Sequence, residues 1–254
     1  MGDVGYERRG SVAVLTIERR ERRNAIDGPT AAQLGDAFDA FEADEHARAL
    51  VLTGAGEQAF CAGADLKAIE SFAERLDDPG GPLGFTRRTA TKPTIAAISG
   101  WCVAGGLELA LWCDLRIAAA GARLGFTERR FGVPLIDGGT QRLPRVVGLG
   151  RALHMILTGR IVDAEEALSI GLVNELVAEG EHLARAIELA EGLAAFPQRT
   201  MLADRRAAID GCGLPLEQGL ALEARSGAQT FRDARAGAAS FAAGAGRGGA
   251  GAGA

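Results

Sequence analysis

Residues 92–119 read KPTIAAISGWCVAGGLELALWCDLRIAA, and this stretch decides the fold. The apolar run 94–99 predicts a buried strand, the glycines after it predict a tight turn, and GLELALWCD at 106–114 predicts a buried helix. A further strand is expected at 115–120. A membrane-spanning helix needs about 20 apolar residues, but the glycines and Glu108 interrupt this stretch and favour the buried strand and helix.

The segments before this stretch continue the alternation of strands and helices. Strands are expected at Val12–Ile17 and Ala49–Thr53, because both runs are rich in β-branched and large apolar residues. Between them, Asp27 and Pro29 open a helix that we expect to end at Ala43. Its apolar face carries Leu34, Phe38 and Phe41.

Shorter elements are expected around these. Residues 60–69 predict a loop that leads into a helix. Residues 77–84 (DDPGGPLG) are expected to interrupt regular secondary structure, and a further helix is expected to end before Pro93. After a glycine-bearing loop at 125–140, the chain turns mainly to helices. These are expected at 142–157, 164–171 and 181–195, with a short strand at 172–177.

The order of elements predicts an α/β fold with a helical C-terminal part. We expect three regions: an α/β core at 1–178, a helical region at 179–236 and a Gly/Ala-rich tail at 237–254. The tail is expected to be disordered, because glycine and alanine cannot bury enough surface to offset the entropy of ordering them.

Composition narrows the class of protein. Of the 254 residues, 47% are hydrophobic and 24% are charged, which is the balance of an ordinary globular protein. The net charge of −5 argues against nucleic acid as the main partner, since phosphate binding needs a surplus of Lys and Arg.

The four cysteines form no CxxC pair, which argues against a zinc site. The first residues do not resemble a signal peptide, and reduced thiols then predict a cytoplasmic protein.

Two glycine-bearing turns, 62–67 (AGADLK) and 104–108 (AGGLE), each precede a predicted helix. Helix N-termini carry N–H groups without intrahelical partners and favour negative charge. If the turns meet in space, one N–H from each would point at a single oxygen, which is the geometry of an oxyanion hole. Glycine at 105 would let the backbone approach a ligand closely. The alternative is a pair of ordinary tight turns.

Three acidic residues are candidates for proton transfer. Glu108 lies in the first turn of an otherwise apolar helix, where it would be largely buried; the alternative is a carboxylate that only compensates the helix dipole. Glu128 lies in a TERR cluster, which alone is typical of a solvated face. Two carboxylates around one water are what acid–base addition of water requires. Asp137 is either a third acid of the site or a turn residue.

Other catalytic classes find no support. The sequence has no GxSxG elbow and no GxxxxGK[ST] loop, which argues against a serine hydrolase and a nucleoside triphosphate site. His46, His154 and His182 all lie in segments expected to be helical and are predicted to be structural.

Four separated blocks resemble the crotonase superfamily (enoyl-CoA hydratase/isomerase family) in order and spacing. They lie at 59–67 (AFCAGADLK), 92–119, 124–148 (LGFTERRFGVPLIDGGTQRLPRVVG) and 157–177 (LTGRIVDAEEALSIGLVNELV). The resemblance implies a spiral of ββα units followed by a helical trimerisation region. It also implies a homotrimer or a homohexamer, an acyl-CoA thioester as substrate, and no cofactor beyond the CoA portion of that substrate.

The resemblance assigns roles to individual positions. The N–H groups of Ala64 and Gly105 would form the oxyanion hole for the thioester oxygen, and Glu108 and Glu128 would be the catalytic acids. The residues implied to line the CoA channel are Ala62, Asp65, Leu66 and Lys67, with Ala25 of the Arg23–Ala25 turn, while Phe241 would stack on the adenine.

Three features depart from the family pattern. Leu135 and Ile136 make the loop after the second glutamate bulkier than in the family. Asp137 lies one position from an acid that some isomerases and dehydratases of the family carry. The C-terminus is basic in the family, but Arg247 is the one basic residue of the tail here. The leading hypothesis is hydration of a 2-enoyl-CoA. The alternatives are an enoyl-CoA isomerase or another double-bond reaction on acyl-CoA, and a non-catalytic acyl-CoA-binding member.

Overall fold

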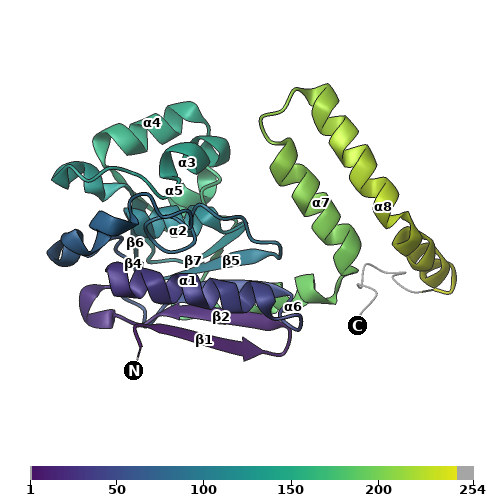
Figure 1. Ribbon diagram of the computed structural model, residues 1–254, viewed down its shortest axis with the longest axis horizontal. Coiled ribbons are helices and arrows are strands. Elements are labelled where there is room, and N and C mark those ends of the chain that lie inside the picture. Colours follow the sequence, from purple (N-terminus) through teal and green to yellow (C-terminus); the bar gives the residue numbers. More distant parts are fainter. Residues whose placement is uncertain (1, 245–254) are drawn as a thin grey trace. The chain divides into compact units, whose positions relative to one another are not determined.

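The computed structural model describes residues 2–244, and the chain divides into two compact units, Met1–Ala190 and Glu191–Ala254. The first unit holds two sheets (Figure 1). The larger sheet has the order β1 (Val4–Arg9), β2 (Val12–Ile17), β3 (Ala49–Gly54), β5 (Thr94–Ile98), β7 (Leu115–Ala119) and β10 (Glu175–Val177). The smaller sheet has the order β4 (Ala59–Cys61), β6 (Trp101–Val103), β8 (Arg123–Gly125) and β9 (Ile161–Asp163).

Three successive ββα units build the centre of the first unit. Each unit sends its first strand to the larger sheet and its second to the smaller sheet, and then forms a helix. The helices are η2 (Leu66–Arg75), α2 (Gly105–Trp112) and η3 (Thr127–Phe131). Because β3, β5 and β7 are parallel neighbours in one sheet, and β4, β6 and β8 in the other, the chain advances as a spiral. This confirms the predicted ββα spiral.

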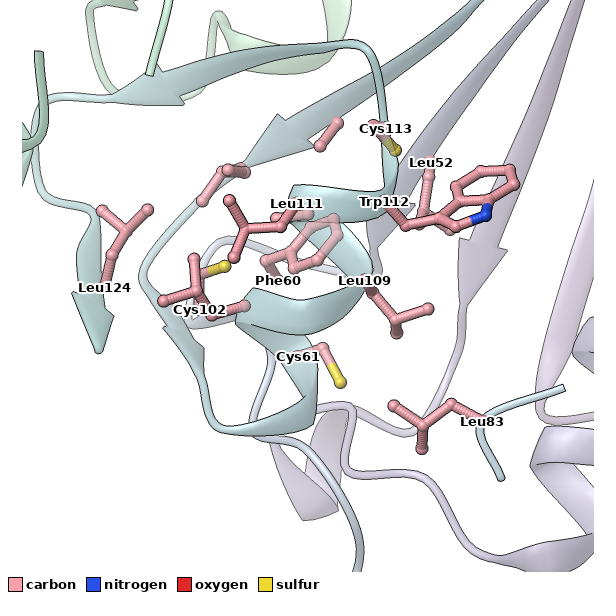
Figure 2. Close-up of a cluster of buried hydrophobic side chains, with 14 of the residues drawn as sticks. Leu52, Phe60, Cys61, Leu83, Cys102, Leu109, Leu111, Trp112, Cys113 and Leu124 are labelled. Atoms are coloured by element: carbon pink, nitrogen blue, oxygen red, sulfur yellow. The ribbon is translucent and has the colours of Figure 1, made fainter. Parts of the chain in front are cut away.

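The apolar runs form strands because they are buried on both faces. Every residue of β3 and of β5 is buried, which explains why these segments read as continuous apolar stretches instead of alternating ones. Helix α2 is likewise apolar all round and packs inside the core (Figure 2). Glu108 is the charged exception on this helix.

Helices cover and extend this core. Helix α1 (Gly28–Ala43) begins as predicted: Asp27 caps it by accepting from Thr30 N at 2.9 Å, and Leu34, Phe38 and Phe41 are buried. The other helices of the first unit are η1 (Arg20–Arg22), α3 (Gly139–Val147), α4 (Leu149–Thr158), α5 (Ala164–Ser169) and the start of α6 (His182–Ala195).

Helix α7 (Gln198–Gly211) and α8 (Leu216–Ala242) form a helical hairpin within the second unit (Figure 1). Both helices expose large apolar side chains, including Ile209, Leu216, Leu220, Phe231 and Phe241. Among residues 2–244, no helix is both long and apolar enough to span a membrane.

The structure corrects several predicted elements. The further helix expected to end before Pro93 is absent: residues 76–93, after η2, form turns, bends and irregular backbone. The single helix expected at 142–157 is two helices, since Gly148 adopts a positive φ of 82° between α3 and α4. Helix α8 continues to Ala242, past the expected start of a disordered tail, because its alanines are strong helix formers. Residues 245–254 lie outside the described part.

Candidate active site

A cavity of about 430 Å³ lies in the first unit, and both glycine-bearing turns and all three candidate acids reach it. Ala62, Ala64 and Gly105 line one part, and Glu108, Glu128 and Asp137 line another. The remaining wall is largely apolar and includes Leu66, Ile69, Phe72, Leu76, Pro82, Leu83, Phe131, Val133, Pro134 and Ile136. The cavity therefore combines a few polar groups with an apolar pocket, which is typical of a small-molecule site.

The two glycine-bearing turns are in direct contact. A Cβ added to Gly63 would lie 2.8 Å from Gly105 N, and a Cβ added to Gly105 would lie 3.7 Å from Ala64 N. Gly63 also has a φ of 86°, which favours glycine. Ala104 takes a φ of 53° although it carries a Cβ, so the turn before α2 stores backbone strain.

The Ala64 and Gly105 N–H groups are available to a ligand. Gly105 is the first residue of α2, where an N–H has no partner within the helix. Among residues 2–244, neither N–H donates to a loop, turn or cap carbonyl. Two adjacent unused donors at a helix start are the arrangement that binds an oxyanion.

Glu108 is 3% exposed and is held by the start of another helix. Its Oε1 accepts from Asp137 N at 3.0 Å and from Gly139 N at 2.7 Å, at the N-terminus of α3. The pKa of Glu108 is raised to about 8: burial is the largest cause, the charges of Asp137 and Glu128 add to it, and the two N–H groups act to lower it. Because Oε1 is occupied, a proton on Glu108 would sit on Oε2.

Glu128 is 6% exposed, so it does not lie on the solvated face that its TERR context suggested. Its two carboxylate oxygens are both buried without a hydrogen-bond partner in the part of the chain described. Burial raises the pKa of Glu128 to about 7. A buried polar group without a partner costs stability, so its retention here needs a functional reason.

Asp137 is buried beside Glu108. Its Oδ1 accepts from Leu83 N at 3.1 Å and from the Thr86 hydroxyl, which ties the 83–86 loop to the start of α3. Burial raises the pKa of this carboxyl, although Thr86 and Leu83 act to lower it. Asp137 is thus both a loop-holding residue and a third acid in the cavity wall.

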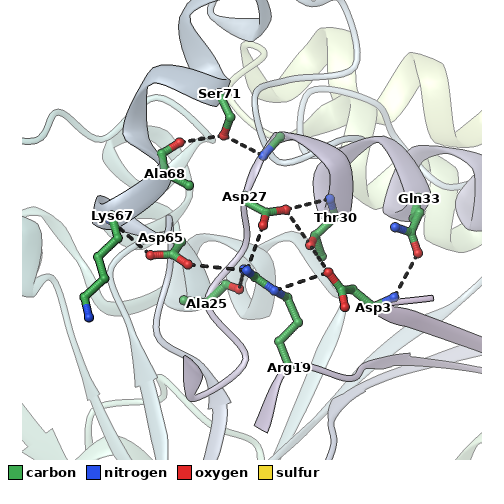
Figure 3. A network of polar contacts seen from close by, with 11 residues as sticks. Asp3, Arg19, Ala25, Asp27, Thr30, Gln33, Asp65, Lys67, Ala68 and Ser71 are labelled. Carbon is green, nitrogen blue, oxygen red and sulfur yellow. Dashed lines mark hydrogen bonds and ion pairs between the residues drawn. The ribbon is translucent and has the colours of Figure 1, made fainter. Parts of the chain in front are cut away.

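Other residues assigned by resemblance lie away from the cavity wall. Asp65 points towards Arg19, Lys67 extends outwards, and the Ala25 carbonyl accepts from Arg19 (Figure 3). Phe241 is 62% exposed on α8 in the second unit. Of the predicted CoA-channel residues, Ala62 and Leu66 line the cavity, and the adenine contact of Phe241 stays a prediction.

Two functional features were not anticipated from the sequence. The N-terminus of α3 holds Glu108, and a Cβ on Gly139 would lie 3.0 Å from Glu108 Cγ. The Gly138–Gly139 pair was a usable signal for a close approach. Arg19 is buried among three aspartates, and nothing in the charged run 18–23 (ERRERR) distinguished it from the other arginines there. Among residues 2–244, no group of three His, Cys, Asp or Glu side chains could hold a metal.

Comparisons with known proteins agree with this geometry. A family model described as Enoyl-CoA hydratase/isomerase matches residues 7–243. The chain is 36% identical to a short-chain-enoyl-CoA hydratase of Clostridium acetobutylicum, over 91% of this chain and 90% of that protein. It is 38% identical to an (E)-benzylidenesuccinyl-CoA hydratase of Thauera aromatica, over 85% and 86% of the two chains.

A solved structure shows the same fold. An enoyl-CoA hydratase from Mycobacterium tuberculosis superposes with a TM-score of 0.89, at 36% identity, over 95% of this chain and 96% of that one. The ββα spiral and the helices after it are therefore shared with a protein of similar length.

Proposed function

The chain belongs to the enoyl-CoA hydratase/isomerase family, and we propose that it adds water across the 2,3 double bond of a 2-enoyl-CoA thioester. One observation carries the proposal: two buried carboxylates, neither of which forms an ion pair within residues 2–244, share a cavity with two unused N–H donors. The hydratases among its relatives, at 36% and 38% identity, support the same reaction.

The N–H groups of Ala64 and Gly105 would bind the thioester oxygen. As water adds to C3, electrons move onto this oxygen and an enolate forms, so the two hydrogen bonds strengthen in the transition state. Losing one such donor costs about 100–1000-fold in rate in enzymes with comparable sites. The strained backbone of Ala104, directly before Gly105, is part of the turn that holds these two N–H groups in place.

Glu108 and Glu128 would move the protons. With pKa values of about 8 and about 7, the pair holds one proton on average between these pH values. The ionised carboxylate takes a proton from the water as its oxygen bonds to C3, and the protonated one gives a proton to C2. One water is consumed, and the pair again holds one proton, now on the other residue.

A second reaction class follows from Asp137. A third buried acid in the same wall would allow a proton to be removed and returned at different carbons, which is double-bond isomerisation. An isomerase would convert a 3-enoyl-CoA into a 2-enoyl-CoA without gain of water. A non-catalytic acyl-CoA-binding member would need neither the acids nor their raised pKa values.

The assembly and location belong to the same proposal. The family resemblance supports a homotrimer or a homohexamer with no cofactor besides the CoA of the substrate, and the free cysteines support a cytoplasmic location. Light scattering on the purified chain would distinguish a trimer from a hexamer, and a monomer would contradict the proposed assembly.

The test is to mix purified protein with crotonyl-CoA and follow the loss of the conjugated enoyl-thioester absorbance, with mass spectrometry of the product. Rapid loss with a gain of one water establishes hydration. Loss of a 3-enoyl-CoA without water gain would establish the isomerase instead. Binding of both esters without turnover would overturn the enzyme assignment.

A further inference from the structure

Arg19 is a buried arginine outside the cavity wall, with three carboxylates around it (Figure 3). Its side chain is 10% exposed. Nη2 lies 2.7 Å from Asp27 Oδ2 and 3.4 Å from Asp65 Oδ2, while Nε lies 3.3 Å from Asp3 Oδ2. Nη1 donates to the Ala25 carbonyl. One guanidinium therefore joins the N-terminal segment, the start of α1 and the turn that carries Ala64.

The two loops held by Arg19 also pair through their backbones. Ala62 N donates to the Arg23 carbonyl at 3.1 Å, Ile26 N to Gly63 O at 2.8 Å, and Asp65 N to Ile26 O at 2.6 Å. These bonds bracket residue 64 on both sides. The direction of the Ala64 N–H therefore depends on where the 23–26 loop lies.

Without Arg19, the carboxylates it joins would repel one another in a buried place. At Asp65 and Asp27, the other donors reach only Oδ1: Lys67 N at 3.1 Å for Asp65, and Thr30 N at 2.9 Å for Asp27. The Oδ2 atoms of both residues face Arg19. Removing one partner of a buried ion pair leaves an uncompensated charge. Asp65 would then turn towards water and take its neighbour Ala64 with it.

We propose that Arg19 is a positioning residue for the oxyanion hole, and that Asp65 transmits its effect as an ion-pair partner instead of contacting CoA. The inference rests on the proposed function, because it requires that Ala64 N–H bind the thioester oxygen. Arg19 touches no reacting atom, so its loss would lower kcat more than it raises KM. The enolate gains more from the two N–H groups than the ground-state carbonyl does.

The experiment uses the purified full chain and 4-dimethylaminocinnamoyl-CoA, whose absorbance shifts to the red when its thioester carbonyl accepts strong hydrogen bonds. The variants are Arg19→Gln, Arg19→Lys and Asp65→Asn. Arg116→Gln is the matched control, since Arg116 is equally buried but donates to the Leu172 and Cys113 carbonyls. Hydration of crotonyl-CoA and circular dichroism are measured on each.

We expect the red shift to shrink in Arg19→Gln and kcat to fall about 100-fold, the effect of a misplacement of about 1 Å. Arg19→Lys keeps the positive charge, so it should retain part of the red shift and part of kcat. Asp65→Asn should lower both by less than Arg19→Gln does. Arg116→Gln should keep the full red shift per folded molecule. If Arg19→Gln does not fold, the red shift and kcat of Asp65→Asn and Arg19→Lys test the proposal instead.

Full red shift and full kcat in folded Arg19→Gln, or in Asp65→Asn and Arg19→Lys together, would overturn the positioning role. Absence of any red shift in the wild-type protein is a different result. It would contradict the oxyanion hole itself, and with it the proposed function.

Discussion

The first unit contains two groups of buried charged side chains that are built in opposite ways. Around Arg19, three aspartates face one guanidinium, and backbone N–H groups reach the other carboxylate oxygens of Asp27 and Asp65. In the part of the chain described, the cavity residues Glu108, Glu128 and Asp137 form no ion pair with Lys or Arg, and the carboxylate of Glu128 accepts no hydrogen bond.

The difference appears in the protonation of the two groups. Burial would raise the pKa of Asp27, but Thr30 and Arg19 keep it below its ordinary value. In the cavity, burial is only partly offset, and the pKa values of Glu108 and Glu128 rise to about 8 and about 7. Buried carboxylates face a guanidinium where they hold the backbone, and they lack an ion-pair partner in the described residues where protons must move.

The largest effect is expected from removing the titratable groups. Glu108→Gln and Glu128→Gln should each lower kcat for crotonyl-CoA hydration by about 100–10,000-fold, because neither residue alone can take a proton from water and return one to C2. Steady-state kinetics measure this, with circular dichroism and CoA-ester binding as controls for folding. Turnover near the wild-type rate in either variant would remove that residue from the mechanism.

The next effect concerns the contact between the two turns. In Gly63→Ala, the new Cβ would lie 2.8 Å from Gly105 N at a residue with a φ of 86°, so the two N–H groups must separate. We expect a loss of about 100–1000-fold in kcat/KM. Gly10→Ala is the control, since Gly10 also has a positive φ of 59° but meets nothing within 4 Å. Equal losses in both variants would mean that strain, not the contact, is responsible.

A smaller effect is expected on stability. The folded state raises the pKa of Glu128 from 4.5 to about 7, so it binds the proton more tightly than the unfolded chain does. Stability is therefore lost as pH rises between these values and stays lower above them. Glu128→Gln should be more stable than wild type by roughly 1–3 kcal/mol at pH 8.5 and by much less at pH 5. Urea unfolding at both pH values measures this, and a destabilised variant at pH 8.5 would contradict it.

The smallest effect is the change of rate with pH in the unmodified enzyme. One proton on the pair should give a bell-shaped kcat/KM profile, with limbs near the pKa values of about 7 and about 8. Beyond each limb the rate should fall about tenfold per pH unit. A flat profile from pH 6 to 9 would show that the pair does not control the reaction.

Much of the fold could be predicted from local patterns. Strands β3 and β5 and helix α2 are apolar runs bounded by glycine or proline, so their burial is visible in the sequence. The smaller sheet was missed because β4, β6, β8 and β9 have three residues each, too few to show a period. These strands exist because neighbouring turns of the spiral pair with them.

The site shows the same division. The burial of Glu108 could be predicted from the apolar residues of its own helix. The place of Gly105 in the site could be predicted from the glycine-bearing turn around it. The burial of Glu128 depends on the chain packed over η3, and the direction of Asp65 depends on Arg19, 46 residues away. Such contacts between distant segments leave no local pattern in a single sequence.

The contrast between the two buried groups can be measured directly by nuclear magnetic resonance, with ¹³C-labelled carboxyl groups of Asp and Glu titrated in the free enzyme. We expect Glu108 and Glu128 to titrate near pH 7–8, while Asp27 stays ionised down to acidic pH. Titration of both glutamates near their ordinary pKa of 4.5 would contradict it. The cavity would then hold two ordinary carboxylates, with no shared proton to give to C2.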